Sequence, residues 1–189
     1  MEKYKILLAS KSPRRREILH LLNLPFTVVT IDGLDESYPD DLEPEKVSEF
    51  ISNKKADAFL KIIKEHEIII TADTIVVCDG KIMGKPKDSR DAIEMLKFLS
   101  GKTHKVTTGV TVATKDTRVS FSSETLVTFA ELSDNEIRYY VDTYHPMDKA
   151  GAYGIQEWIG AVAVAKIEGS FYNVMGLPVH RLYQVLKKF

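Results

Sequence analysis

Strand-like apolar runs and helix-like apolar repeats alternate along most of the chain. Runs typical of strands occupy residues 6–9, 26–31, 68–70, 75–77, 104–113, 119–129 and 161–167. Helical patterns begin at Pro13 and Pro44, cover 89–99 and 133–143, and follow Pro178. The strands 104–113 and 119–129 are joined by the polar turn 115–117, which favours an antiparallel pair. The pattern therefore predicts an α/β fold with a mixed sheet flanked by helices.

The long helix that Pro44 opens carries its apolar residues at helical spacing, at Val47, Phe50, Ile51, Ala58 and Ile62. Lys54 and Lys55 both border this stripe. Each lysine either rests its stem on the core with its ammonium group in water, or presents that group to a phosphate. A helical wheel cannot decide which of the two points inward.

The helix at Pro13 begins with an unusual set of charges. Ser12 is a good N-cap and Pro13 suits the first helical position. The electropositive end of a helix favours acidic residues, yet its first turn carries the three arginines 14–16. The segment is either a solvated basic helix end or an anion site, in which a strand, a tight turn and a helix start present N–H groups and guanidinium groups to phosphate.

Two acidic positions are candidates for chemistry. Asp73 stands between the apolar runs 68–70 and 75–77, where a carboxylate is costly to desolvate without a cation or several donors. It either satisfies the N–H groups of a neighbouring loop or acts as a metal ligand or general base. Glu36 lies in the acidic loop 32–41, which is either simply solvated or supplies a second oxygen ligand for a divalent cation.

Other motifs are weaker. Gly84-Lys85-Pro86 is a rigid loop, suited either to a phosphate contact or to an ordinary surface turn. The segment 101–103 resembles the end of a P-loop, but Leu96 occupies the position of its first glycine. The five histidines lack metal-ligand spacing, and Cys78 follows an apolar run, so neither a zinc site nor a covalent nucleophile is expected.

Composition narrows the function classes. The 189 residues include 26 Lys and Arg against 27 Asp and Glu. A protein that binds long nucleic acids usually carries a clear basic excess, so we expect no nucleic-acid polymer as the main partner. The single cysteine excludes an internal disulfide and suits a reducing cytoplasm. No stretch has the apolar length of a membrane span, so we expect a cytoplasmic protein without a membrane partner.

Taken together, ordered motifs over nearly the whole chain closely resemble the Maf family of nucleoside triphosphate pyrophosphatases, historically called septum formation proteins. The resemblance is carried by residues 8–10 and 12–15, Glu36, 55–56, 72–74, 84–86, 99–104, 148–156 and 176–178. It implies a Maf/ITPase-like fold, a single domain over residues 1–189 whose two lobes flank a central cleft, and a homodimer in many members.

The resemblance also implies a reaction and a site. The reaction is cleavage of a nucleoside triphosphate between its α- and β-phosphates, giving a monophosphate and pyrophosphate with a divalent cation, Mg²⁺ or Mn²⁺. Asp73 takes the place of the proton acceptor. Our own hypothesis from the chemistry of the residues is that Asp73, with Glu36, holds a metal that activates water. The family register selects Lys55 over Lys54. The implied substrate-binding residues are Ser10, Arg14, Arg15, Lys55, Thr74, Lys85, Lys149 and Gln156.

The resemblance also bears on base choice, which is linked to Arg14, Thr74 and Gln156. Gln156 after Gly154-Ile155 is similar to the branch that prefers dTTP and UTP. An amide donates and accepts at once, which suits the edge of uracil or thymine. This chain departs from its relatives at Glu157 and Trp158, where a glycine commonly follows the glutamine. This bulkier pair is expected to reshape the base pocket.

Lys11 is a second departure, because a small residue is usual there. It either adds a phosphate contact or points to solvent. Two other function classes stay open: a protein that senses nucleotides or regulates division without hydrolysis, and a nucleic-acid-binding module that uses the cluster 14–16.

Overall fold

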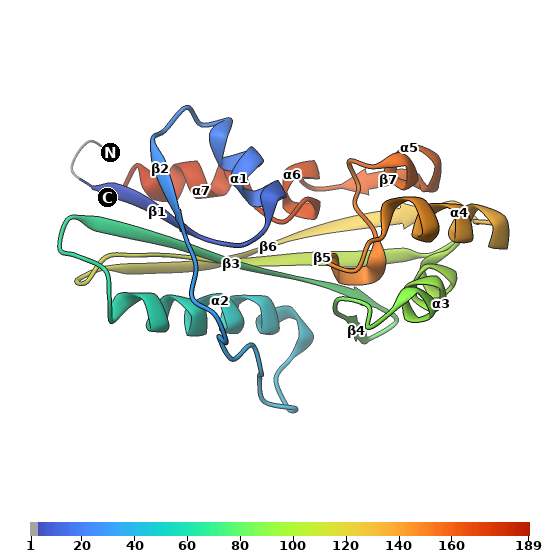
Figure 1. Cartoon of the computed structure of the whole chain (residues 1–189), viewed down its shortest axis with the longest axis horizontal. Helices are drawn as coiled ribbons and strands as arrows, with labels where there is room; N and C mark the ends of the chain where they lie inside the picture. Colours follow the sequence, from blue (N-terminus) through green and yellow to red (C-terminus); the bar gives the residue numbers. More distant parts are fainter. Residues whose placement is uncertain (1–3) are drawn as a thin grey trace. The chain divides into compact units, whose positions relative to one another are not determined.

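The chain forms an α/β fold, described here for residues 4–189 of a computed structural model (Figure 1). Its strands are β1 (Lys5–Ala9), β2 (Phe26–Val29), β3 (Glu67–Cys78), β4 (Lys81–Met83), β5 (Thr103–Ala113), β6 (Arg118–Phe129) and β7 (Val164–Glu168). Its α-helices are α1 (Pro13–His20), α2 (Pro44–Leu60), α3 (Ser89–Leu99), α4 (Asp134–Tyr144), α5 (Trp158–Ala163), α6 (Phe171–Val174) and α7 (Val179–Leu186), and η1 (Ala150–Ala152) is a 3₁₀ turn. No helix within residues 4–189 is long and apolar enough to cross a bilayer.

The seven strands form one mixed sheet, as predicted. Its order is β2-β1-β3-β5-β6-β7, and β4 pairs with β3. β1 runs parallel to β2 and β3, whereas β3 with β4 and β6 with β7 are antiparallel. A four-residue connection joins the neighbouring strands β5 and β6, which is too short for a parallel crossover, so this pair is antiparallel as expected.

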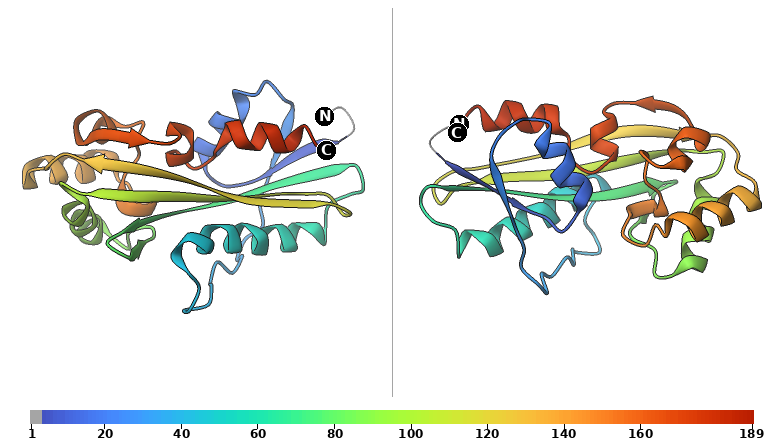
Figure 2. Two further views of the ribbon diagram at one scale, coloured as in Figure 1. Left: turned by 180° about the vertical axis from the view of Figure 1, so that it is seen from behind. Right: turned by 45° about the horizontal axis from the view of Figure 1, so that its top comes forward.

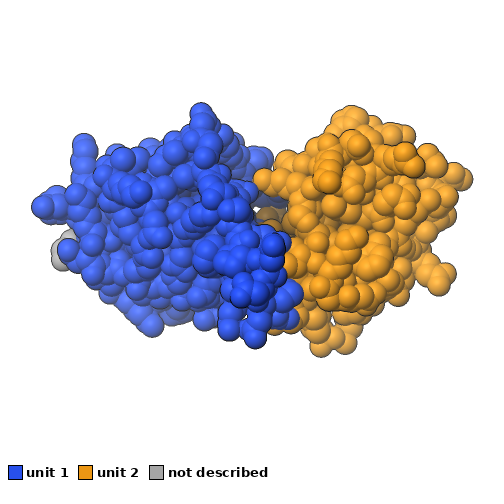
Figure 3. All heavy atoms as spheres, turned by 90° about the horizontal axis from the view of Figure 1, so that it is seen from below, with its two compact units in different colours: residues 1–73, 108–123, 176–189 blue, residues 74–107, 124–175 orange. Residues whose placement is uncertain are grey.

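The chain divides into two compact units, coloured separately in Figure 3. Unit 1 contains the described residues up to Asp73 together with 108–123 and 176–189, and unit 2 contains 74–107 and 124–175. The division falls between Asp73 and Thr74, inside β3. Each unit is described separately below.

In unit 1, α2 covers one face of the sheet, and α1 and α7 lie on the other face (Figures 1 and 2). The predicted apolar stripe of α2 is only partly correct: Val47 and Ile51 are buried, but Phe50 is exposed, and Ile62 is exposed and lies beyond the helix, which ends at Leu60. The buried face includes the polar pair Ser48 and Ser52 instead.

A close approach of helix and strand explains why small side chains face the sheet there. A Cβ atom added to Gly109 on β5 would lie 2.2 Å from the backbone nitrogen of Glu49. The helix is also tied to its neighbours through Ser52, whose carbonyl accepts a hydrogen bond from the Thr71 hydroxyl at 2.7 Å. The Ser52 hydroxyl lies 3.0 Å from that of Thr111. These contacts fix α2 against β3 and β5.

Unit 2 has its own core, which includes the inward faces of α3 and α4. Both helices begin at side-chain caps: Asp88 accepts from the N–H of Asp91, and Ser133 forms a reciprocal capping box with Glu136. One prediction here is wrong. Residues 161–163 belong to α5 rather than to a strand, and β7 begins only at Val164. A short apolar run fits a buried helix as well as a strand, and the period alone cannot separate them.

Candidate active site

The strand β1 ends beside β3, and α1 begins at that same edge. Ala9, the last residue of β1, pairs with Thr71, so Asp73 extends two residues farther along β3. β1 lies between β2 and β3, while α1 and α2 lie on opposite faces of the sheet in Figures 1 and 2. Such a reversal of connections at the carboxyl ends of parallel strands is where open α/β sheets bind ligands.

The turn between β1 and α1 is fixed by two serines. The Ser10 hydroxyl accepts the N–H of Ser12 at 3.1 Å, and the Ser12 hydroxyl accepts the N–H of Arg15 at 3.5 Å. The first turn of α1 holds no acidic residue. Lys11 binds Asp32 on the exposed surface. Three arginines and no acidic residue make this helix start electropositive, and the anion site stays a prediction.

Arg15 is anchored from the far end of the sequence. Its Nε donates to the carbonyl of Gly176 at 2.8 Å. Gly176 has a φ of 111°, a backbone conformation that other residues rarely adopt. Burial lowers the pKa of Arg15, whereas the nearby charges of Asp73 and Glu36 raise it. The guanidinium group therefore belongs to one electrostatic cluster with both predicted acidic residues.

Lys55 joins those two acids. Its Nζ lies 2.8 Å from Glu36 Oε1 and 2.8 Å from Asp73 Oδ1, and its side chain is 11% exposed. Lys54 turns the other way and binds Asp35 and Ser37 in the acidic loop. The structure thus resolves the ambiguity of the helical wheel, because Lys55 lies inward and Lys54 fastens the loop that carries Glu36.

The acidic pair also bears on a divalent metal. Glu36 Oε1 and Asp73 Oδ1 approach one ammonium nitrogen, so they are at most twice 2.8 Å apart and can converge on a single cation. Within residues 4–189, no group of three or more His, Cys, Asp or Glu side chains forms a metal cluster. Mg²⁺ often uses only one or two carboxylates and completes its shell with water and substrate phosphates. The pair fits that pattern.

Unit 2 contains the other predicted residues. Lys149 is buried, and its Nζ lies 2.7 Å from Asp148 Oδ1 and 3.2 Å from Glu157 Oε1. The loop of Lys85 is joined to the same segment, because the N–H of Gly151 donates to the Gly84 carbonyl at 3.1 Å.

The remaining unit 2 residues are accessible to different degrees. Lys85 and Gln156 are exposed, and Thr74 is half-buried. A Cβ atom at Gly151 would lie 3.0 Å from Val76, which shows how closely this segment packs on β3. The segment 150–156 and the loop of Lys85 therefore form one connected set beside the second half of β3.

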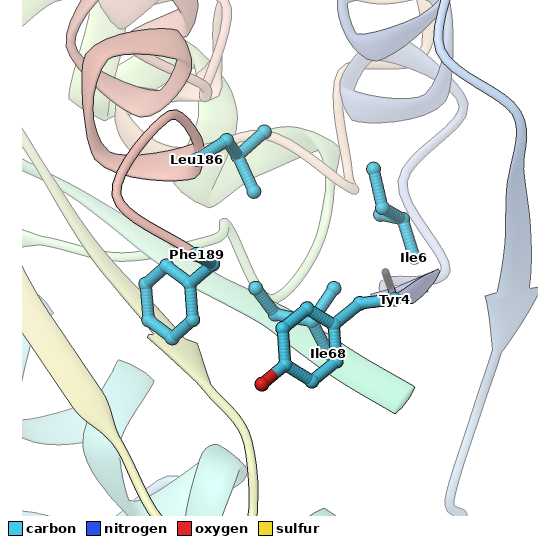
Figure 4. Close-up of a pocket in the computed structure, with 5 residues that line it drawn as sticks. All are labelled: Tyr4, Ile6, Ile68, Leu186 and Phe189. Atoms are coloured by element: carbon cyan, nitrogen blue, oxygen red, sulfur yellow. The ribbon is translucent and has the colours of Figure 1, made fainter. Parts of the chain in front are cut away.

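Three contributors were not predicted as site residues: Gly176 as an anchor of Arg15, Lys54 as the loop fastener, and Tyr140, whose hydroxyl binds Glu157. The sequence did draw attention to Lys54, because it borders the apolar stripe of its helix. It also drew attention to Glu157, the partner of Tyr140, as a departure from the relatives. Gly176 and Tyr140 act through contacts distant in sequence, which no local pattern reveals. Unit 1 also has a small pocket, which is lined by Tyr4, Ile6, Ile68, Leu186 and Phe189 (Figure 4). None of these five is a predicted site residue, and the Tyr4 hydroxyl is the one polar side-chain atom among them.

Comparison with known proteins shows which family the chain is similar to. The sequence model of the Maf-like protein family matches residues 5–189. A Bacteroides thetaiotaomicron protein named dTTP/UTP pyrophosphatase is 54% identical over 188 residues, covering 100% of this chain and 97% of the relative. Proteins of the same name from Phocaeicola vulgatus and Porphyromonas gingivalis are 56% and 51% identical, covering 100% of this chain and 97% and 96% of the relatives.

A solved structure agrees at the level of the fold. The Staphylococcus aureus Ham1 protein superposes with a TM-score of 0.56 at 16% identity, covering 97% of this chain and 98% of the other. This likeness concerns the fold alone. The family match over 5–189 and the full-length relatives at more than half identity, by contrast, concern the sequence itself. The chain belongs to the Maf-like protein family.

Proposed function

We propose that this protein is a nucleoside triphosphate pyrophosphatase that hydrolyses dTTP and UTP to the monophosphate and pyrophosphate. The observation that carries the proposal is the cluster in unit 1, where Arg15, Lys55, Asp73 and Glu36 meet near the carboxyl end of β1, beside the middle of β3. The names of the full-length relatives support the reaction and the pyrimidine preference.

In the proposed mechanism, Arg14 and Arg15 at the start of α1 bind phosphate oxygens through their guanidinium groups. Asp73 is the general base and takes a proton from water. The water oxygen forms a bond to the α-phosphorus, and the bond from that phosphorus to the bridging oxygen breaks. Pyrophosphate leaves with the electron pair. Such chemistry depends mainly on positioning and charge stabilisation, so a covalent nucleophile is unnecessary.

Lys55 keeps the base in place, because its ammonium group holds Asp73 Oδ1 from the rigidly packed helix α2. The metal is assigned to Glu36 and Asp73. When bound, Mg²⁺ or Mn²⁺ neutralises charge that develops on the phosphates. Lys85 and Lys149 are assigned to the phosphates, and Thr74 and Gln156 to substrate choice. Ser10 shapes the phosphate-binding turn through its bond to the Ser12 N–H.

The decisive test measures products. Purified protein is incubated with dTTP, UTP, dCTP, ATP and GTP, with Mg²⁺, with Mn²⁺ or with EDTA, and pyrophosphate, orthophosphate and nucleotides are quantified. We expect dTMP and UMP with pyrophosphate, and, in ¹⁸O-labelled water, label in the monophosphate. Release of orthophosphate with a diphosphate product would refute cleavage between the α- and β-phosphates.

A matched pair of variants tests the base. Asp73→Asn should lower kcat by at least about 10²-fold, the effect expected for a lost general base. Asp57→Asn, which removes an exposed carboxylate on α2 that pairs with Arg118, should retain activity. Wild-type turnover by a folded Asp73→Asn protein would remove Asp73 from the mechanism.

The alternative function is a protein that binds triphosphates and regulates division or septum formation without hydrolysis. It would show saturable nucleotide binding by calorimetry and no pyrophosphate release. A homodimer and a cytoplasmic location remain predictions from the sequence; sedimentation and cell fractionation test them.

A further inference from the structure

Gln156 lies in a tight turn whose two ends are tied to one buried hydroxyl. The N–H of Glu157 donates to the Gly154 carbonyl at 3.0 Å, which places Gln156 third in a four-residue turn. The N–H of Gly154 donates to the Tyr140 hydroxyl at 3.0 Å. That hydroxyl donates in turn to Glu157 Oε2. Tyr140 therefore holds the turn at both ends, at Gly154 through the backbone N–H and at Glu157 through the side-chain carboxylate.

The anchor itself is rigid. Tyr140 is fully buried on α4 and its ring stacks on that of Tyr144 at a centroid distance of 5.1 Å. α4 is fixed at its start by the capping box of Ser133 and Glu136. Gln156 is exposed although Gly154 and Ile155 before it are buried. A buried support thus presents one exposed amide.

The same carboxylate fixes a second predicted substrate contact. Glu157 uses Oε2 for Tyr140 and Oε1 for the Lys149 ammonium group, and its side chain is only 19% exposed. Asp148, the other partner of Lys149, is 54% exposed. A shielded ammonium group needs a partner that is itself shielded, and Glu157 supplies it.

Gly154 makes this arrangement sterically feasible. A Cβ atom there would lie 2.9 Å from Glu157 Cδ and 3.1 Å from Lys149 Cε. Glycine therefore lets the Glu157 carboxylate and the Lys149 stem pack against the turn, so that Tyr140, Lys149, Gly154 and Glu157 form one connected cluster.

We propose that Tyr140 and Glu157 are positioning residues for base recognition, which hold the Gly154–Glu157 turn so that Gln156 reads the pyrimidine edge. This inference rests on the proposed function. Thymine and uracil present an N–H between two carbonyl groups, whereas cytosine presents an acceptor and an amino group at the same edge. An amide that can move or flip pairs with either edge, so discrimination requires a fixed turn.

Tyr140→Phe removes one oxygen and keeps the buried ring. It should raise KM for dTTP and reduce the ratio of kcat/KM for dTTP over dCTP by about tenfold, since small misplacements of a contact group cost up to about 10²-fold. The loss should fall on KM more than on kcat. Glu157→Ala should behave similarly, whereas Glu157→Gln, which still accepts from the tyrosine, should retain most of the discrimination.

The control is Glu168→Ala, which removes an exposed ion pair with Lys166 and should leave the ratio unchanged. Hydrogen exchange adds a readout that does not depend on catalysis: the Gly154 amide should exchange faster in Tyr140→Phe because its acceptor is gone. If Tyr140→Phe does not fold, the two Glu157 variants and their exchange rates provide the test.

The outcomes separate the two proposals. An active wild type whose folded Tyr140→Phe and Glu157→Ala variants keep its KM and its dTTP over dCTP ratio overturns this inference alone. Equal losses for every nucleotide that track a lower melting temperature also overturn it, because they indicate a structural role only. A wild type that releases no pyrophosphate from any nucleotide overturns the proposed function and this inference with it.

Discussion

Replacing Lys55 with methionine tests the charge cluster most directly, because the change keeps an unbranched apolar stem of similar length and removes the ammonium group. In the native protein this group lies 2.8 Å from a carboxylate oxygen of Glu36 and of Asp73. At that distance, and at an effective dielectric constant of about 20, each pair attracts by about 6 kcal/mol before the cost of desolvation is subtracted. Without Lys55, two carboxylates at most twice that distance apart repel each other by at least about 3 kcal/mol at the same dielectric constant.

Part of this repulsion is relieved, because the Glu36 side chain is 50% exposed and can turn toward water. Breaking a buried pair from one side typically costs about 3–5 kcal/mol, and we expect the lower end here. For a chain of this size, about 3 kcal/mol lowers the melting temperature by roughly 6–12 °C. Thermal unfolding followed by circular dichroism at pH 7.5 measures this shift.

A double-mutant cycle makes the reasoning refutable, because the sign of one effect should reverse. Glu36→Gln removes a partner of Lys55 in the wild type, so there it should be neutral or destabilising. In the Lys55→Met background the same substitution removes a repelling charge, so it should raise the melting temperature. If Glu36→Gln destabilises both backgrounds equally, the two carboxylates do not interact through Lys55 and the cluster is misread.

Three further predictions concern stability. Burial lowers the pKa of His104 to about 4, so His104 stays neutral in the native state, whereas the unfolded chain protonates it below about pH 6.5. The free energy of unfolding should therefore fall by up to about 1.4 kcal/mol per pH unit between pH 6.5 and pH 4. Urea titrations of His104→Gln at the same pH values should lack this pH-dependent loss. Gly109→Ala should destabilise unit 1 by about 1–3 kcal/mol, because its Cβ would overlap the backbone of α2, and unchanged urea midpoints would contradict that packing. Ser133→Ala should cost about 1 kcal/mol through loss of the capping box of α4, with exposed Ser89→Ala as the control.

Local sequence signals predicted the starts of α1, α2, α3, α4 and α7 and most strands, but missed α5, α6 and β4 and divided β3 into the runs 68–70 and 75–77. Ser12, Asp88 and Ser133 each bond to a backbone N–H three residues later, so the information lies within one turn of helix. The helix 158–163 was missed because its buried face is set by packing in the unit 2 core, which includes Ile159 and Ala163. Likewise, Ser48 and Ser52 face the sheet only because Gly109 lets the helix approach.

The site residues divide in the same way. Residue types and spacing singled out Arg14, Asp73, Glu36 and the two lysines 54 and 55. Each of them could equally be explained as an ordinary solvated or structural residue. The choice of Lys55 came from the family resemblance, and the structure supports it with contacts to loop 32–41 and to β3, which are 19 and 18 residues away along the chain. No helical period contains such information, because tertiary packing decides which flank of a helix faces a strand.

The charges at the start of α1 then have a physical explanation. Arginines at the positive end of a helix are locally unfavourable by a few tenths of a kcal/mol or more. Here the opposing charge comes from β3 and from the acidic loop, since Asp73 and Glu36 raise the pKa of Arg15 against the effect of burial. Arg14, Arg15 and Lys55 nevertheless outnumber these two carboxylates, while Lys11 and Lys54 are neutralised by other acids. The cluster keeps a net positive charge beside the electropositive start of a helix, which favours binding of a polyanion such as a triphosphate.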